Sequence, residues 1–132
     1  IDISLEAVIS TRARGGAALR RDVFAPIPGE GRWPWVVLAD GNIGIGGDPL
    51  RLLRRLTEIL APGGAAVIEV STTEIDNRGT SRVRRPDGTF GPEFSWAVVG
   101  ATALSRLAAA ARWQVETDWQ QDGRRVLTVR RP

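Results

Sequence analysis

The stretch that decides the fold runs from Trp35 to Pro49 and reads WVVLADGNIGIGGDP. Its first five residues are all apolar, as is typical of a strand that is buried on both faces of a parallel sheet. A glycine-rich loop, residues 40–47, follows directly. Asp48 is then placed to cap a helix and Pro49 to occupy its first turn. A buried strand, a glycine-rich loop and a sharply started helix together predict an α/β fold.

The segments that follow this stretch continue the same alternation. Leucine and isoleucine recur at helical spacing from Leu52 to Leu60, and Pro and Gly in residues 61–64 predict the end of that helix. The apolar run 65–70 then predicts a second buried strand. Strands linked through helices form right-handed crossovers, so we expect a mostly parallel sheet.

The segments that precede it have the same character. Residues 1–3 look like the end of a strand, and Ser4 is placed to cap a short helix that stops at Gly15 and Gly16. Residues 17–24 predict a further short strand, followed by a loop rich in Pro and Gly.

The C-terminal half departs from this alternation. Residues 71–96 form a polar, arginine-containing segment that we interpret as an insertion or lid-like loop, because connections of this length are uncommon unless functional or disordered. A helix is predicted over residues 101–112. Apolar and polar residues alternate over 113–129 around a turn, which predicts an antiparallel hairpin that closes the sheet. We expect residues 1–132 to form one domain.

The composition narrows the class of protein. Cysteine and histidine are both absent, which excludes disulfides and thiolate nucleophiles and removes the commonest metal ligands, so no metal site is expected. No apolar run approaches the length of a membrane span, and a soluble cytoplasmic protein is the default expectation. All 18 basic residues are arginine, with a net charge of +3. Their scatter along the chain favours a coding bias over a nucleic-acid site, so no nucleic-acid partner is expected.

Acidic residues end three of the predicted strands: Asp2, Asp22 and Asp40. Ligands of open α/β sheets bind at the carboxyl ends of the parallel strands, where a carboxylate can accept hydrogen bonds from a ribose or an adenine amino group. Each of these residues has an alternative role as an ordinary turn or capping residue. The glycines after Asp40 favour a ligand role for that loop, because glycine lets a backbone approach a ligand closely.

Residues 40–49, with the helix and residues 61–64 that follow, resemble the fourth-strand region of class I S-adenosylmethionine-dependent methyltransferases. The resemblance is to a bacterial subgroup of the small-molecule type. Residues 1–4 resemble the end of the family's second strand, and residues 21–24 resemble the end of its third. The closing hairpin is similar to the family's last two strands, which distinguish it from dinucleotide-binding Rossmann domains.

The resemblance implies a three-layer Rossmann-like sheet, mostly parallel with an antiparallel C-terminal hairpin. It implies S-adenosylmethionine as cofactor and direct methyl transfer to a small-molecule acceptor. The acidic residue of the second strand holds the cofactor ribose in this family, and the end of the third strand meets the adenine. The expected cofactor-binding residues are Asp2, Ile3, Asp22, Val23, Asp40, Gly41 and Asn42.

Acceptor binding is expected in the segment 71–96, where Phe90, Phe94 and Trp96 provide aromatic side chains for a substrate lid. The alternative for this segment is a surface insertion without a role in binding. Methyl transfer needs alignment and exclusion of water more than an acid–base pair. If a base were required, Asp40, Glu69 and Glu74 are the carboxylates near the strand ends, and the sequence does not rank them.

One part of the family pattern is not found in the sequence. The first strand and its Gly-x-Gly-type loop, which hold the methionine portion of the cofactor, are expected before Asp2. The resemblance therefore implies a domain that is incomplete at the N-terminus, and activity only when the missing segment is present. In the alternative, the chain is a non-catalytic methyltransferase-fold protein that acts as a binding or dimerisation module, so a homo-oligomer is one expected assembly.

Two further alternatives come from other classes of protein. The first half of the chain would also suit an NAD-dependent oxidoreductase, although the closing hairpin and the glycine loop of residues 40–47 argue against this. Binding of nucleic acid through the arginines would give an affinity that falls steeply with salt.

Overall fold

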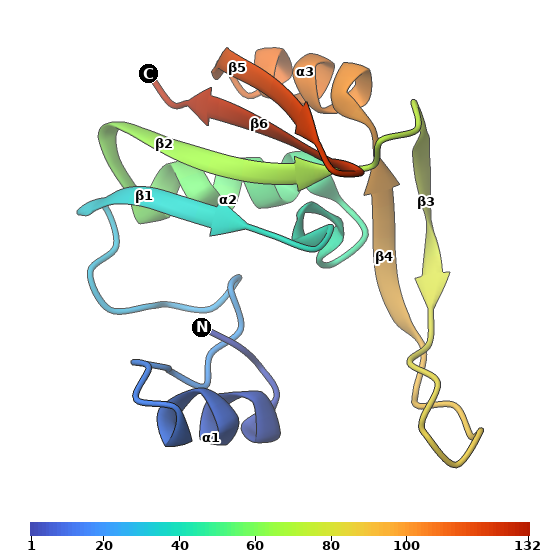
Figure 1. The fold of residues 1–132 in the computed structure, drawn as a ribbon. Coiled ribbons are helices and arrows are strands. Elements are labelled where there is room, and N and C mark those ends of the chain that lie inside the picture. Colours follow the sequence, from blue (N-terminus) through green and yellow to red (C-terminus); the bar gives the residue numbers. More distant parts are fainter.

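The computed structural model describes residues 1–132 as an α/β fold with two separate β-sheets. None of its helices is long and apolar enough to cross a membrane. Figure 1 labels the elements in chain order. They are α1 (Leu5–Ala13), β1 (Trp33–Leu38), the 3-10 turn η1 (Asn42–Gly44), α2 (Pro49–Ile59), β2 (Leu60–Val70), β3 (Asp76–Ser81), β4 (Phe94–Val99), α3 (Ala101–Ala110), β5 (Gln114–Gln121) and β6 (Arg124–Arg130).

The main sheet has four strands in the order β1-β2-β6-β5. β1 and β2 run parallel, whereas β6 runs antiparallel to both of its neighbours. The predicted α/β class and the closing antiparallel hairpin, β5 and β6, are therefore confirmed. In this sheet parallel pairing is confined to β1 and β2, and two single parallel bridges occur elsewhere, Asp2 with Arg20 and Ser71 with Gly100. Helices α2 and α3 cover one face of the sheet, and α1 lies apart from it (Figure 1).

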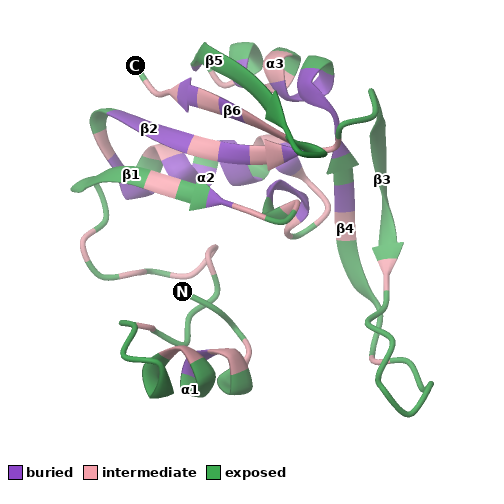
Figure 2. Ribbon diagram, viewed as in Figure 1, coloured by how far each residue is buried: buried purple, intermediate pink, exposed green.

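Helix α2 supplies much of the core because its apolar residues form one stripe. Asp48 Oδ1 accepts a hydrogen bond from the Arg51 amide and Pro49 occupies the first turn, so the predicted start is confirmed. Leu52, Leu53 and Leu56 on this stripe are almost completely buried. Figure 2 shows the buried residues concentrated in α2, β2, β4 and α3.

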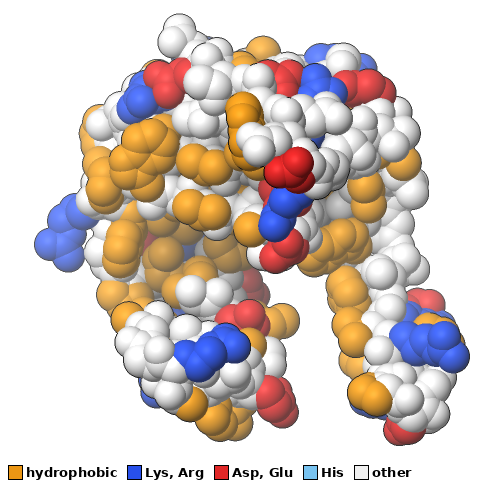
Figure 3. All heavy atoms as spheres, viewed as in Figure 1, with side chains coloured by type: hydrophobic (Ala, Val, Ile, Leu, Met, Phe, Trp, Pro, Cys, Tyr) orange, Lys and Arg blue, Asp and Glu red, His pale blue; other side chains and the backbone are white.

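Strand β1 differs from its prediction. It forms where expected, but it is not buried on both faces: Trp35 is 51% exposed and Val37 67% exposed, and only Leu38 is buried. The reason is that successive side chains of a strand point to opposite faces of the sheet: Val36 and Leu38 face the core under α2 and α3, whereas Trp35 and Val37 project from the other face. Figure 3 shows hydrophobic side chains gathered on the surface at this side of the sheet.

The N-terminal segment is less regular than predicted. Helix α1 forms with Ser4 as its cap, since Ser4 Oγ accepts a hydrogen bond from the Ala7 amide. The strand predicted over residues 17–24 is wrong: this stretch makes only the bridge between Arg20 and Asp2. A strand needs a neighbour to take its backbone hydrogen bonds, and no strand of the main sheet lies beside this segment.

The long polar segment contains regular structure that the sequence did not predict. β3 and β4 pair antiparallel over residues 76–81 and 94–99 and form a two-stranded sheet of their own. This ribbon extends away from the main sheet (Figure 1). The end of β4 nearest α3 is buried in the core, because Ala97 and Val99 are about fully covered.

Candidate functional site

The loop after β1 is held in a constrained conformation. Asp40 and Gly41 have φ values of 52° and 73°, a left-handed region that glycine adopts easily and aspartate tolerates. The Asp40 amide donates a hydrogen bond of 2.8 Å to Glu69 Oε2 at the end of β2. Arg124 Nη2, from the start of β6, donates one of 2.9 Å to Asp40 Oδ1. Groups from β2 and β6 therefore fix the place of this loop.

The glycines of this loop have different roles. A Cβ at Gly44 would lie 2.0 Å from the Ala97 carbonyl oxygen and 2.9 Å from the Trp96 ring, so this glycine lets η1 approach β4. Gly41 has no protein atom within 4 Å of the position where a Cβ would lie. Packing thus explains Gly44, and the free space leaves Gly41 as the glycine whose backbone is open to a ligand.

The two glutamates named as base candidates are both engaged in ion pairs. Glu69 accepts hydrogen bonds from Arg124 Nε and Nη2 at 2.9 and 2.6 Å, and the pairing with Arg124, followed by the bond from the Asp40 amide, lowers the pKa of Glu69. Glu74 pairs with Arg125 at 2.8 Å and accepts a hydrogen bond from the Thr102 amide at 3.0 Å. The bond from Thr102 is the main cause of the lowered pKa of Glu74. A carboxylate stabilised in its ionised form is a weak base.

Asp2 and Asp22 have the same local geometry in separate turns. Asp2 Oδ1 accepts the Ser4 amide at 2.8 Å, and Asp22 Oδ1 accepts the Phe24 amide at 2.9 Å. Both side chains are exposed, and no protein group donates to Oδ2 of either residue. The turn role and a ligand role are therefore compatible, because each carboxylate keeps an oxygen with free lone pairs.

The neighbours of these two carboxylates differ in their contacts. Ile3, beside Asp2, is exposed to solvent, whereas Val23, beside Asp22, packs against the main core. Asn42, in η1, makes no side-chain hydrogen bond that stabilises the fold. The structure therefore ties the Asp22 side of the expected site to the body of the protein and leaves the Asp2 side on the separate N-terminal segment.

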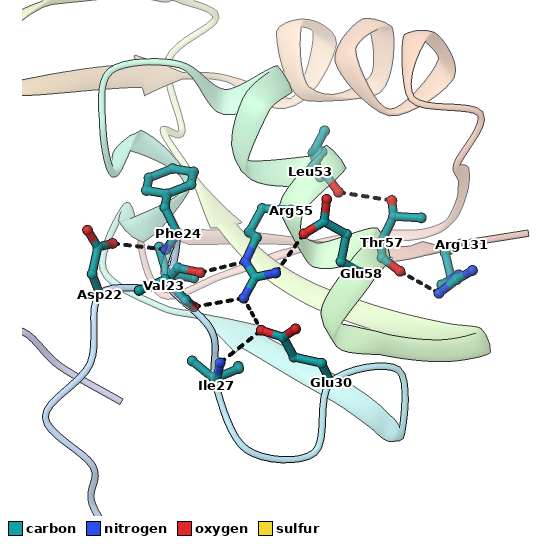
Figure 4. Close-up of polar contacts among 11 residues, drawn as sticks. Asp22, Val23, Phe24, Ile27, Glu30, Leu53, Arg55, Thr57, Glu58 and Arg131 are labelled. Atoms are coloured by element: carbon teal, nitrogen blue, oxygen red, sulfur yellow. Dashed lines mark hydrogen bonds and ion pairs between the residues drawn. The ribbon is translucent and has the colours of Figure 1, made fainter.

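Arg55 is the residue that makes this tie, and sequence reasoning missed it. Its Nε donates to the Val23 carbonyl and its Nη2 to the Ala25 carbonyl, both at 2.8 Å, and it pairs with Glu30 and Glu58 (Figure 4). Burial by itself would lower the pKa of Arg55, but the hydrogen bonds to these two glutamates outweigh it and raise the pKa. The signal was present: Arg55 stands in the apolar stripe of α2, where a charge needs a partner.

A hollow of about 290 Å³ lies between the loop after β1, the end of β2 and β4. Such a volume is at the small end of the range for ligand pockets. Of the three aromatic residues expected to bind substrate, Trp96 lines the hollow. Phe94 packs edge-to-face on the Trp96 ring, with the two ring centroids 5.8 Å apart. Phe90 does not join them; it is exposed near the tip of the ribbon, bridged to Arg84. The residues around the hollow are Gly41, Ile43, Glu69, Val70, Ser71, Trp96, Ala97, Val98 and Val99.

The sequence matches no protein-family model and no curated protein. Solved structures match it over almost its whole length. An S-adenosylmethionine-dependent methyltransferase from Bacteroides fragilis, in complex with S-adenosyl-L-homocysteine, superposes with a TM-score of 0.72 at 19% identity, over 97% of this chain and 60% of that one. The fold is that of class I S-adenosylmethionine-dependent methyltransferases.

Two further structures with the methyltransferase fold agree. The 1,6-didemethyltoxoflavin-N1-methyltransferase of Burkholderia thailandensis matches with a TM-score of 0.60 at 17% identity, over 98% of this chain and 58% of that one. A methyltransferase of Methanosarcina mazei matches with a TM-score of 0.65 at 15% identity, over 98% and 79%. The chain thus spans about three fifths of the length of the first two proteins. In this chain the hollow lies beside the carboxyl ends of the two paired parallel strands, β1 and β2.

Proposed function

We propose that this protein transfers a methyl group from S-adenosylmethionine to a small-molecule acceptor. The observation that supports the proposal most strongly is the match, over 97% of the chain, to a methyltransferase bound to S-adenosyl-L-homocysteine. The Burkholderia protein is described with a bound small molecule, 1,6-didemethyltoxoflavin, which favours an acceptor of that general kind. We propose a cytoplasmic location. The chain has no cysteine, so it needs no oxidising compartment to form disulfides.

The exposed carboxylates fit the polar parts of this cofactor. Asp2 would accept hydrogen bonds from the ribose hydroxyls through Oδ2, with Ile3 beside it, and Asp22 would accept one from the adenine amino group, with Val23 beside it. The turns that fix Oδ1 of both aspartates hold these side chains in place before binding. The open backbone at Gly41, with Asp40 and Asn42 on either side, would approach the cofactor from the β1 end.

Bound cofactor supplies an activated methyl group, and the chain's own residues then have to align an acceptor and exclude water. The loop after β1 is suited to alignment, because Glu69 and Arg124 hold Asp40 from two sides. Glu69 itself acts here through position and not as a base, since the hydrogen bonds from Arg124 and the Asp40 amide stabilise its ionised form and lower its pKa.

We propose further that activity depends on the strand and glycine-rich loop that the family carries before its second strand. The unpaired edge of β1 supports this, because β1 pairs with β2 alone and has no strand on its other side to take its backbone hydrogen bonds. The shorter span of the chain against the Bacteroides and Burkholderia proteins agrees.

Seven of the 18 arginines form ion pairs within the chain, which weighs against a nucleic-acid partner. They are Arg55, Arg78, Arg82, Arg106, Arg124, Arg125 and Arg130. Charges neutralised in this way release few counterions on binding a phosphate backbone, and we propose a protein without a nucleic-acid ligand.

Calorimetric titration with S-adenosylmethionine and S-adenosylhomocysteine tests the proposal. The subjects are residues 1–132 and a chimera that adds the first strand and glycine-rich loop of the Bacteroides protein. We expect micromolar binding by the chimera, about −8 kcal/mol, and weaker binding by residues 1–132. Asp2→Asn should weaken binding, whereas the matched change Asp87→Asn, at the tip of the ribbon, should leave it unchanged. A folded chimera that binds neither compound would overturn the proposal.

A second candidate function is a non-catalytic binding or dimerisation module, favoured by the same exposed edge of β1. Sedimentation velocity over a range of concentrations separates the two candidates. A stable dimer that binds no cofactor would support the module, and a monomer that binds cofactor would support the enzyme.

A further inference from the structure

The hollow beside β4 shares a wall with the proposed cofactor loop. Gly41, in that loop, also lines the hollow, and Glu69 and Ser71 line it from the end of β2. A molecule in the hollow would therefore touch the loop that we propose approaches the cofactor. This adjacency makes the hollow the candidate acceptor site.

The walls of the hollow are apolar and rigid. Ile43, Val70, Ala97 and Val99 all belong to its lining and are buried residues of the protein. The Trp96 ring is held from two sides: Gly44 leaves it no room for an added Cβ, and Phe94 packs against it edge-to-face. A fixed aromatic wall selects flat rings, because ring faces and edges pack in few arrangements.

The hollow offers no unpaired charge. Glu69 is the one charged residue in the lining, and it already accepts three hydrogen bonds, two from Arg124 and one from the Asp40 amide. A charged group brought into the hollow would lose water without gaining an opposite charge, which is costly. The chemistry of the walls therefore favours an uncharged ligand.

Two side-chain hydrogen-bond donors among the lining residues have no protein acceptor. One is the indole N–H of Trp96, whose Nε1 lies beside Gly44. The other is the hydroxyl of Ser71, which accepts the Thr73 amide at 3.1 Å but donates its proton to no protein group. Free donors at an apolar site pair best with a carbonyl oxygen or a ring nitrogen of the ligand.

We infer that the methyl acceptor is an uncharged, flat compound of one or two rings that carries a carbonyl oxygen or ring nitrogen as a hydrogen-bond acceptor. This inference rests on the proposed methyl transfer, since that function makes the ligand of the hollow an acceptor. The volume of about 290 Å³ sets the size, because it is at the lower limit for sites that enclose small ligands.

The test uses a probe of this class, 2-quinolone, with the 132-residue chain labelled with ¹⁵N. The chain has five tryptophans, whose indole N–H groups give separate signals, and Trp96→Phe assigns the one that matters. We expect 2-quinolone to shift the Trp96 signal in a saturable manner. The anion 2-quinolone-4-carboxylate and the cation 4-(aminomethyl)-2-quinolone, which both keep the carbonyl oxygen, should bind at least about tenfold more weakly.

Two variants sharpen the result. Trp96→Phe keeps an aromatic wall but removes the donor, and Ser71→Ala removes the other donor. In calorimetric titration, which does not need the Trp96 signal, each should weaken 2-quinolone binding about fivefold, the effect of one neutral hydrogen bond. Trp119→Phe, on the exposed strand β5, is the control and should leave binding unchanged. The inference is overturned if Trp96 does not respond to 2-quinolone, or if a charged probe binds as well.

This readout needs no methyl donor, so its failure is distinguishable from failure of the proposed function. If the protein binds cofactor but Trp96 does not respond to 2-quinolone, the proposed methyl transfer stands and the inferred class of acceptor is wrong. A response at Trp96 in a protein that binds no cofactor would leave a ring-binding site and remove the transferase.

Discussion

Strands β1 and β2 are adjacent, parallel and both rich in apolar residues, yet they differ in exposure on one of their two faces. In their shared register Leu38 pairs with Ile68 and Val37 with Val67. Leu38 and Ile68 are both buried, whereas on the opposite face Val37 is 67% exposed and Val67 is half-buried. β2 has a neighbour on each side, β1 and β6, while β1 has one. The burial of a strand is thus set by its neighbours as much as by its composition, and an apolar run alone does not say which side of it is covered.

The largest expected effect comes from truncating a buried side chain of β2, compared with an exposed one of β1. Ile68→Ala should lower the free energy of unfolding by about 3 kcal/mol, because it leaves a cavity in a closed core. Val37→Ala should change the free energy of unfolding by less than about 0.5 kcal/mol, since the Val37 side chain is largely exposed and its truncation removes little buried apolar area. Urea denaturation of both variants measures the contrast. Equal costs would mean that β1 is covered in solution.

A smaller effect is expected at the anchor of the segment that leads into β1. Arg55→Met should lower the free energy of unfolding by about 2–3 kcal/mol, because the Val23 and Ala25 carbonyls and Glu30 lose their donor. Arg54→Met, an exposed neighbour on the same helix, is the matched control and should have almost no effect. If the two variants lose the same stability, the contacts of Arg55 do not hold this segment.

The open edge of β1 should affect association more than stability. Val37→Lys places a charge on the exposed face and should reduce concentration-dependent association, since charged side chains protect an edge strand from pairing. Thr128→Lys, on a strand of the same sheet that is paired on both sides, serves as the comparison. Sedimentation velocity of the two variants and the parent measures the difference. If both changes reduce association equally, the surface through which the chains associate is not the open edge of β1.

The smallest effect on stability per ionisable group is expected from a change of pH. This effect again distinguishes β1 from β2. β1 has no ionisable side chain, whereas Glu69 of β2 and Glu116 of β5 have pKa values lowered by hydrogen bonds to Arg124 and Arg130. A carboxylate with a lowered pKa in the folded state stabilises the fold above its unfolded pKa, and this stability is lost as pH falls through the folded pKa.

Thermal melting should therefore show a stability that is nearly constant from pH 6 to 8, where no histidine titrates, and that declines below about pH 4.5. Glu69→Gln should make the acid limb shallower. A decline that begins near neutral pH would contradict this assignment, because no side chain of the chain has its ordinary pKa there.

Local signals in the sequence predicted the elements that depend on local chemistry. The Asp48 cap, the start of α2 and the closing hairpin all follow from short-range patterns and are confirmed. The strand over residues 17–24 failed because its formation needs a partner that the sequence pattern does not reveal. Strand β3 was missed because its residues are polar and exposed on both faces, so no alternation marked it, and without β3 the sequence offered β4 no partner.

The candidate site divides in the same way. Gly41, predicted just after a strand end, lines the hollow, and so does Trp96, which was predicted with Phe90 and Phe94 as an aromatic residue of the segment 71–96. Phe90 was grouped with Trp96 by residue type alone and lies elsewhere. The cofactor roles of Asp2 and Asp22 stay predictions. Arg55 escaped notice because its importance comes from carbonyls about 30 residues away in the chain, a relation that only the fold creates.

Gly44 has a consequence for which residues position 44 can accept. The Ala97 carbonyl and the Trp96 ring lie directly against this glycine, so no side chain fills the space between η1 and β4. Any larger residue at this position would have to separate η1 from β4. The Trp96 ring, which lines the hollow, and the loop that begins at Asp40 would then no longer share their present spacing.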